Sequence, residues 1–377
     1  MRSRILIGGI GEVDGSAWNR LTDHAYPHLS HEFLRALENE DCLGERVGWV
    51  PRHLLIEDAD GTLVAALPMY LKHNSFGEFV FDWTWADAHH RMGLDYYPKL
   101  VVASPLTPAT GPRLLLRPEL RDSVSARRVT GLAIEAARNL GVSSLHWLFA
   151  DDPFLADDAR LLRRTGCQFH WHNRNYGSFD DFLGRLTSKR RKEILRERRM
   201  VREAGVDLIQ ASGLDVAKDE WRIFHSLYRG TFVKHGNYPA LTLEFFMRVA
   251  IVLGEQVRLV LALRRGKIIA VAYFLVGADC LYGRYWGCRE EIPGLHFEAC
   301  YYQGIEFCIE RGLSRFEPGA QGEHKISRGF LPTPTFSYHW VAHEAFRRPI
   351  APFLRREAEL MDDYMRRLME RSPYRRD

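Results

Sequence analysis

Two β-hairpins that lie half a chain apart restrict most strongly how this sequence can fold. In HLLIEDADGTLVAALPMYL the turn is Asp60-Gly61, and in RLVLALRRGKIIAVAYFLV it is Arg265-Gly266-Lys267. Glycine in a short turn between two extended runs is a strong hairpin signal. The turn glycines are 205 residues apart, and each hairpin is followed by more strand residues, a helix that ends at glycine and another strand, in EAARNLGVSSLHWLF and EFCIERGLSRFEPGA. The pattern predicts an internal duplication of one α/β unit.

The length of the chain agrees with two units. At 377 residues it exceeds what one ordinary core holds, and about two domains are expected. We place the boundary beside a basic segment, so that residues 1–180 form the first domain and residues 181–377 the second. The basic segment, residues 188–202, reads SKRRKEILRERRMVR, with eight basic and two acidic residues. It is predicted to be a connecting helix, and its charge fits a solvated helix face and a phosphate-binding surface about equally.

The composition is that of a soluble globular protein, with 46% hydrophobic and 27% charged residues. The longest uncharged apolar run, Ile268–Ala278, is far shorter than the ~20 residues that span a bilayer, and the N-terminus lacks a signal-peptide pattern. The six cysteines form no CxxC pair and are expected to be reduced thiols. We therefore expect a cytoplasmic protein without stable membrane insertion. The net charge of +4 permits an anionic substrate.

The sequence gives little support for metal chemistry or for the common nucleophile motifs. His170 and His172 share one face of a predicted strand, but no third ligand is nearby, so no metal site is predicted. A GxSxG elbow and a P-loop are both missing from the sequence.

The densest group of polar residues lies between Leu295 and Arg328. His296 and Glu298 stand at the start of a predicted helix that stops at Gly312, and a short strand then ends at Glu317. The glycine-containing loop that follows carries further polar side chains, namely Gln321, Glu323, His324, Lys325 and Arg328. This concentration makes the stretch our first candidate for a functional site.

The order hairpin, strand, helix, strand resembles that of the GNAT acyltransferases, and a tandem pair of such units is similar to the FemAB-like family, in its peptidoglycan-biosynthesis-like branch of N-acyltransferases. The resemblance covers nearly the whole chain and is carried by GWVPRHL (48–54), GEFVFDW (77–83), YYPKL (96–100), TPATGPR (107–113), LYGRYWG (281–287), LHFE (295–298) and EPGAQGEHK (317–325). It implies an α/β fold with mixed sheets and two tandem GNAT-like acyltransferase domains. It also implies N-acyl transfer to an amine acceptor, either a small molecule or a peptidoglycan precursor.

The resemblance leaves the donor open. The acyl-CoA loop of single GNAT domains, Arg/Gln-x-x-Gly-x-Gly/Ala, is not evident after either hairpin. Two donors therefore remain, acyl-CoA and the aminoacyl-tRNA that the Fem ligases use, and tRNA is a candidate partner.

Aminolysis of an activated acyl group needs a base for the amine, donors for the oxyanion and an acid for the leaving group. In the fold that the resemblance implies, the donor lies between the strands at residues 281–287 and 314–317. Glu317 is then the first candidate for the base, Glu298 and His296 are the second, and Tyr285 is a candidate acid. The candidate substrate-binding residues in this half are Tyr282, which is also an alternative acid, and Arg284, Trp286, Gln321, His324, Lys325 and Arg328.

Several of these residues have a structural alternative. Strand alternation predicts that Tyr282, Arg284 and Trp286 share one face, where the aromatic rings can also be core. Glu298 at a helix start can compensate the helix dipole. Glu317 can pair with Arg315 or Lys325 without a catalytic role.

A second polar set lies in the first half of the chain, at Lys72, Glu78, Asp82 and Arg113. If one half of the chain binds the donor and the other binds the acceptor, this set is expected to bind the acceptor. Ion pairs with a purely structural role are about equally consistent with the sequence. The competing function is a non-catalytic protein that binds RNA or nucleotide phosphate through the basic helix.

Overall fold

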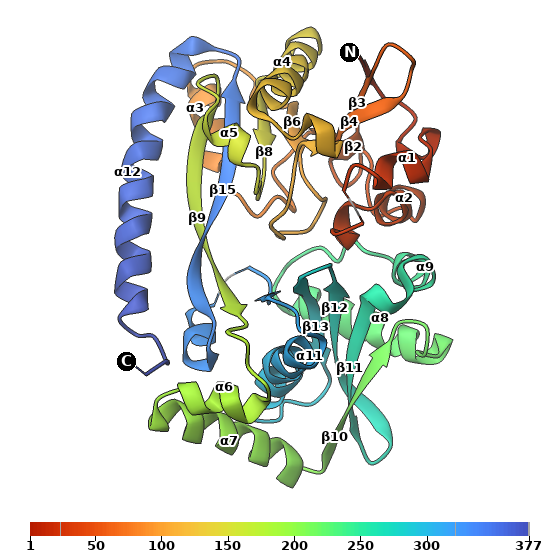
Figure 1. The fold of residues 1–377 in the computed structure, drawn as a ribbon. Helices are drawn as coiled ribbons and strands as arrows, with labels where there is room; N and C mark the ends of the chain where they lie inside the picture. The colour runs from red at the N-terminus through yellow and green to blue at the C-terminus, as the bar shows by residue number, and fades with distance from the viewer. Residues whose placement is uncertain (23, 321, 376–377) are drawn as a thin grey trace. The chain divides into compact units, whose positions relative to one another are not determined.

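The computed structural model describes residues 1–22, 24–320 and 322–375, which form two compact units (Figure 1). The N-terminal unit consists of residues 1–167 and 334–364, and the C-terminal unit consists of residues 168–333 and 365–377. The sequence predicted one boundary near residue 180. Each unit instead takes a second segment from late in the chain, because strand β15 and helix α12 return after the second hairpin unit is complete.

The N-terminal unit contains two sheets. The smaller has the order β1-β3-β4-β7, and the strands of the second follow the order β15-β8-β6-β5-β2. The strands are β1 (Arg2–Ile5), β2 (Trp49–Pro51), β3 (Leu54–Glu57), β4 (Leu63–Leu67), β5 (Met69–Lys72), β6 (Lys99–Val102), β7 (Leu115–Leu116), β8 (Ser144–Trp147) and β15 (Leu331–Val341). β3 and β4 form the first predicted hairpin, and Gly61 in its turn has a φ of +78°, a conformation that favours glycine.

Helix α4 (Ser123–Asn139) packs on the second sheet of this unit. Asp122 caps it by accepting hydrogen bonds from the backbone N–H groups of Val124 and Ser125. The helix ends before Gly141, whose φ of +66° suits a C-terminal glycine. Its apolar face joins β6 and β8 in one core. The other helices of the unit are α1 (Gly15–Asn19), α2 (His31–Asn39), α3 (Trp83–Arg91), α5 (Pro153–Ala156) and α12 (Glu344–Met369), which continues past the unit.

The C-terminal unit has strands in the order β10-β11-β12-β13-β14-β9. They are β9 (Leu162–His172, of which residues 168–172 belong to this unit), β10 (Val206–Ser212), β11 (Val257–Arg264), β12 (Lys267–Val276), β13 (Cys280–Cys288) and β14 (Arg315–Glu317). β11 and β12 form the second predicted hairpin, and β13 and β14 pair in parallel, whereas the other strand pairs among the described residues of this unit are antiparallel. The first unit has the same relation, since β6 and β8 are parallel and flank α4. The two units therefore repeat one arrangement of hairpin, strand, helix and parallel strand.

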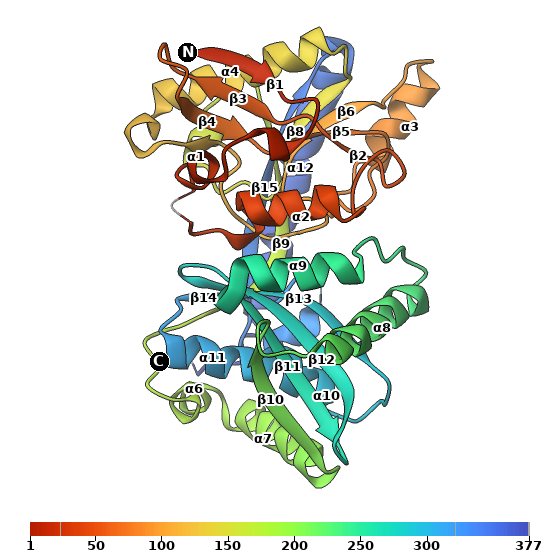
Figure 2. The ribbon, with the colours of Figure 1, turned by 90° about the vertical axis from the view of Figure 1, so that its right-hand side faces the viewer.

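Helices cover both faces of this sheet. They are α6 (Phe179–Arg185), α7 (Ser188–Glu203), α8 (Lys218–Lys234), α9 (Leu243–Leu253), α10 (Leu295–Phe297) and α11 (Gln303–Arg311). Figure 2 shows α8 and α9 on the face of β11–β13 that is turned toward the viewer. The predicted basic helix is α7, and its inner side contacts β10. Within the described ranges, no helix has both the length and the apolar character that crossing a membrane requires.

Candidate functional site

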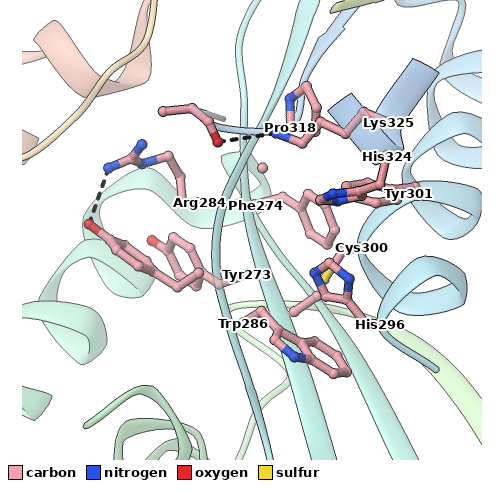
Figure 3. Close-up of a pocket in the computed structure, with 14 residues that line it drawn as sticks. Tyr273, Phe274, Arg284, Trp286, His296, Cys300, Tyr301, Pro318, His324 and Lys325 are labelled. Atoms are coloured by element: carbon pink, nitrogen blue, oxygen red, sulfur yellow. Dashed lines mark hydrogen bonds between the residues drawn. The ribbon is translucent and has the colours of Figure 1, made fainter. Parts of the chain in front are cut away.

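A pocket of about 270 Å³ opens where β13 and β14 separate (Figure 3). The two strands pair only from Cys280 to Tyr282 and from Arg315 to Glu317, while β13 continues to Cys288. Beyond this short ladder the strands part and side chains line the gap. The lining residues are Ala272, Tyr273, Phe274, Gly283, Arg284, Tyr285, Trp286, His296, Cys300, Tyr301, Pro318, Ala320, His324 and Lys325.

A β-bulge shapes the wall of the pocket that β13 forms. Tyr273 pairs with Tyr285 but the next residue, Phe274, pairs with Gly283. Arg284 is therefore the extra residue, and a bulge reverses which way the following side chains point. Trp286 faces His296, with ring centroids 5.4 Å apart. The predicted alternation of Tyr282, Arg284 and Trp286 on one face is wrong, since it assumed an unbroken strand.

On the other side of the sheet, Tyr285 packs against Tyr228 of α8, with ring centroids 5.1 Å apart. Its hydroxyl accepts a hydrogen bond from the guanidinium of Arg284 at 3.3 Å. Figure 3 shows Arg284 at the opposite side of the pocket from Lys325 and His324.

A π-helical turn shapes the opposite wall. The predicted helix is present, but residues Glu298–Tyr302 are wound as a π-helix between α10 and α11. Such turns are rare and are found often at functional sites. This one brings Cys300 and Tyr301 into the pocket, and the Tyr301 hydroxyl lies 3.0 Å from Nε2 of His324. The sequence analysis missed Cys300 and Tyr301, because helical periodicity carries no signal for a π turn.

His296 is one of two imidazoles among the described residues that line the pocket. Burial lowers its pKa to about 4, helped by the positive charges of His324, Lys325 and Arg328. The ring is therefore neutral at pH 7. Among the described residues, its ring nitrogens have no hydrogen-bond partner, so they are available to a ligand.

Lys325 supplies a buried ammonium from the loop after β14. Its Nζ donates to the backbone oxygens of Gly319 at 2.8 Å and Ala320 at 3.2 Å. Gly319 has a φ of +90° and Gly322 has a φ of +112°, conformations that glycine allows. Burial lowers the pKa of Lys325 to about 7, and a lysine has three N–H donors. The loop thus presents a proton donor that titrates near neutral pH.

The two predicted catalytic carboxylates lie outside the pocket lining. Glu298 forms an ion pair with Arg198 at 3.0 Å and accepts a hydrogen bond from Gln303; burial raises its pKa. Glu317 is buried and lies 3.4 Å from Nε of Arg315. Both carboxylates therefore have cationic partners of their own.

The remaining predicted residues of this half are divided. Tyr285, Arg284, Trp286, His296, His324 and Lys325 line the pocket together. Tyr282 is buried outside the lining, and Arg328 pairs with Glu197 at 2.5 Å. Gln321 lies outside the described residues.

In the N-terminal unit, three of the four predicted polar residues meet in a buried network around Lys99, which the sequence analysis missed. Lys99 donates to Glu78 at 2.8 Å and also to Asp82, and Lys72 lies 4.0 Å from Glu78. Burial raises the pKa of Glu78 to about 7 and lowers that of Lys72 to about 7. Burial opposes ionisation of Asp82, but the charges of Lys99 and His146 and the hydrogen bonds from Lys99 and Ser75 together outweigh it, and the pKa falls to about 2.

The fourth residue of that predicted set, Arg113, lies apart from the network. Its guanidinium donates to the backbone oxygens of Leu148 and Ala109, each at 2.7 Å. Its backbone N–H donates to the buried carboxylate of Asp152. Arg113 therefore holds two loops together.

His170 and His172 lie on β9 with ring centroids 6.4 Å apart, and Nε2 of His170 lies 3.1 Å from the side-chain oxygen of Gln168. In the part of the chain that the structure describes, no three His, Cys, Asp or Glu side chains are grouped to hold a metal ion.

Comparison with known families identifies the chain. The FemAB-like family, described as peptidoglycan biosynthesis/recognition, matches residues 9–376. The chain belongs to the FemAB-like family. This confirms the predicted family and the predicted acyltransferase class. Among curated protein sequences, none matches the chain.

Solved structures confirm the fold. The C-terminal domain assigned to a lysylphosphatidylglycerol synthetase from Agrobacterium fabrum is 11% identical, with a TM-score of 0.54 over 90% of this chain and 96% of that one. FemX is 9% identical, with a TM-score of 0.54 over 93% of this chain and all of that one. A tandem GNAT protein of clavulanic acid biosynthesis is 12% identical, with a TM-score of 0.46 over 91% of this chain and 99% of that one. The chain has a mixed α/β fold of two tandem GNAT-like units, as predicted.

Proposed function

We propose that the C-terminal pocket transfers an aminoacyl group from an ester donor to an amine acceptor. The observation that carries the proposal is the meeting of a neutral imidazole, His296, and a buried ammonium, Lys325, in the gap between two parting parallel strands. The edge of β13 beyond Tyr282 is left for the donor, because β14 ends at Glu317.

The chemistry divides between these two side chains. The amine attacks the ester carbonyl, so that a C–N bond forms and the C–O bond to the donor breaks. His296 accepts the proton that the attacking nitrogen loses, because this nitrogen carries a positive charge and is more acidic than the free ammonium once the bond has formed. Lys325 hydrogen-bonds the developing oxyanion and gives a proton to the leaving oxygen, a role that suits a pKa of about 7. Exchange with solvent returns both groups to their starting states.

Two observations favour aminoacyl-tRNA over acyl-CoA as the donor. The loop between β13 and α10 carries two carboxylates, Glu290 and Glu291, each ion-paired and exposed, which disfavours a pyrophosphate beside it. Helix α7 exposes a basic stripe at helical spacing, made of Lys189, Lys192 and Arg196, and none of the three forms an ion pair with another described residue. Such a stripe suits a phosphate backbone. FemX and the lysylphosphatidylglycerol synthetase domain share this fold.

The test is transfer of a labelled acyl group from aminoacyl-tRNA or acyl-CoA to amine acceptors that include peptidoglycan-precursor peptides. We expect transfer from aminoacyl-tRNA, and we expect Lys325→Met and His296→Gln each to lower kcat by about 10²–10⁴-fold. Lys267→Met, at the exposed hairpin turn, is the matched control. Glu298→Gln and Glu317→Gln should retain most of the activity, since neither side chain lines the pocket.

The second candidate function is RNA binding without catalysis, which the α7 stripe also favours. RNA binding with a steep salt dependence, and no transfer from either donor, would support this function and refute the proposed reaction.

A further inference from the structure

A buried ion pair stands behind the pocket, made of one residue from α7 and one from the loop that carries Lys325. Nη2 of Arg328 lies 2.5 Å from Oε1 of Glu197. Both residues are at least nine-tenths buried, with exposed fractions of 6% and 7%. Neither lines the pocket, so the chemistry proposed above does not use them.

The pair contacts both walls of the pocket, the π turn and the segment that carries Lys325. Nη1 of Arg328 donates to the backbone oxygen of His324 at 2.8 Å, directly before Lys325 in the chain. The same guanidinium lies 3.3 Å from the ring centre of Phe297, the last residue before the π turn. The other oxygen of Glu197 accepts a hydrogen bond from the hydroxyl of Tyr302, the last residue of that turn.

The contacts of Arg328 and Glu197 connect the segment that carries His296 to the segment that carries Lys325. His296 precedes the π turn and Lys325 follows β14, and no described backbone pairing joins these two segments. Arg328 and Glu197 bridge them through side chains, and they hold both ends of the π turn as well as the loop. An Arg fork is suited to this work, because its N–H groups have fixed directions and can serve two acceptors at once.

We propose that Glu197 and Arg328 are positioning residues for acyl transfer, which set the distance between His296 and Lys325. The inference rests on the proposed function. Displacing a catalytic group by about 1 Å can cost about 10²-fold in rate, so the pair governs kcat more than substrate binding.

Electrostatics supports the geometry. Arg328 is one of the cations that lower the pKa of His296 and of His324, after burial in each case. If Glu197 loses its charge, the cation of Arg328 is no longer neutralised and the pKa of His296 falls further. If Arg328 is removed instead, the carboxylate of Glu197 remains and the pKa rises. The two changes should therefore move the pH–rate profile in opposite directions, which loss of a purely structural contact would not do.

The experiment compares the full-length chain with Glu197→Gln, Arg328→Met and Arg328→Lys. Glu306→Gln is the matched control. Glu306 pairs at 2.7 Å with Arg198, which lies on α7 like Glu197, but Glu306 does not contact the described residues of the loop that carries Lys325. The measurements are kcat and KM for aminoacyl transfer, the pH dependence of kcat, and hydrogen exchange of peptides covering residues 295–303 and 319–330.

In Glu197→Gln and Arg328→Met we expect kcat to fall by about 10–100-fold, with KM changed by less than about threefold. The acidic limb of the pH–rate profile should shift in opposite directions in these two variants. In Arg328→Lys we expect kcat to recover in part. Exchange in both peptides should rise in the variants. In Glu306→Gln the peptide covering residues 319–330 should exchange as in the wild-type chain, and only this peptide serves as the comparison, because Gln303 in the other peptide donates a hydrogen bond to Glu306. Wild-type kcat in a variant whose loop exchanges faster would overturn the inference.

Failure of the proposed reaction gives a different result. If the wild-type chain transfers nothing from either donor, the proposed function fails; hydrogen exchange then still decides whether the pair fixes the two walls, and unchanged exchange in both peptides overturns that as well.

Discussion

The two units use the same arrangement around a pair of parallel strands but fill the space after it differently. In the N-terminal unit β6 and β8 pair up to Val102 and Trp147, and the loop before Arg113 then continues the contact, with Gly111 bonded to Phe149 and Asp151. The guanidinium of Arg113 donates a hydrogen bond to the backbone oxygen of Leu148. In the C-terminal unit the pairing stops at Tyr282 and Glu317, and a pocket follows. One copy is closed by its own chain, and the other is left open.

Each unit has a buried lysine, and the two lysines differ in their partners and in the direction of their pKa shifts. Lys99 has two carboxylate partners, which outweigh burial and raise its pKa. Among the described residues, Lys325 has only backbone oxygens as acceptors, and burial lowers its pKa to about 7. A buried lysine with anionic partners stabilises a fold, whereas one without them is ready to exchange a proton.

The largest expected difference between the two buried lysines is in how much each contributes to the free energy of unfolding. Lys99→Met leaves Glu78 and Asp82 in the interior without their main cation, and the free energy of unfolding should fall by about 3–5 kcal/mol. Urea unfolding monitored by circular dichroism measures it. Lys325→Met, in the open unit, should change stability far less while it lowers kcat for transfer by about 10²–10⁴-fold; equal losses of stability in both variants would contradict the contrast.

Closing the open unit by one side chain should lower activity. A Cβ at Gly283 would lie 3.1 Å from Cα of Pro318 and 3.3 Å from the ring of Phe316, so Gly283→Val fills the gap between the parted strands. We expect kcat/KM to fall by about 10–100-fold, measured with the donor that supports transfer.

Gly230→Ala is the control for this variant, because a Cβ there meets no atom within 4 Å. Wild-type kcat/KM in a folded Gly283→Val protein would show that the donor does not lie in the gap.

Acid should destabilise the closed unit through its buried histidines. Nδ1 of His146 lies 2.6 Å from Nδ1 of His339, and burial lowers the pKa of His146 to about 3 and that of His339 well below its usual range. Because the unfolded chain binds protons near pH 6.5 and the folded chain does not, stability is lost as the pH falls from about 6.5 towards 3, by up to about 1.4 kcal/mol per pH unit for each histidine.

Urea unfolding between pH 7 and pH 5 measures this slope, and His339→Gln should reduce it because one titrating ring is gone. An unchanged slope in that variant would assign the acid sensitivity to other groups.

The smallest effect concerns the α7 stripe. Lys192→Gln with Arg196→Gln removes two exposed cations and should weaken binding of tRNA by about tenfold at low salt, with a shallower salt dependence. A filter-binding titration at several salt concentrations measures it. Lys218→Gln with Arg222→Gln on α8 is the control, and an equal loss there would mean that binding follows net charge alone.

Local signals predicted much of this fold. Both hairpins, the basic helix and the glycine ends at Gly141 and Gly312 follow from turn and capping residues, and all are present. The stretch from Leu295 to Arg328 also contributes His296, His324 and Lys325 to the pocket.

What the sequence did not predict depends on long-range or irregular geometry. Lys99 lies on β6, which pairs with β5, and its contact with the carboxylate of Glu78 joins residues 21 positions apart in the chain. The bulge at Arg284 and the π turn change side-chain directions without any change in residue type. Residues 334–364 join the first unit after more than 160 intervening residues, a contact that no local pattern encodes.

Helix α7 carries an exposed basic stripe on one side and a buried carboxylate on another, so its residues cannot be shifted along the helix without moving both. Arg196 is exposed, its neighbour Glu197 is buried against Arg328, and Arg198 holds Glu298 and Glu306. Each residue turns the helix by about 100°, so inserting or deleting one residue after Thr187 would move Glu197 out of its buried position and turn the exposed stripe toward a different side. A shift of frame by one residue would displace the buried carboxylate and the outer stripe together, whereas a single substitution changes only one of these features.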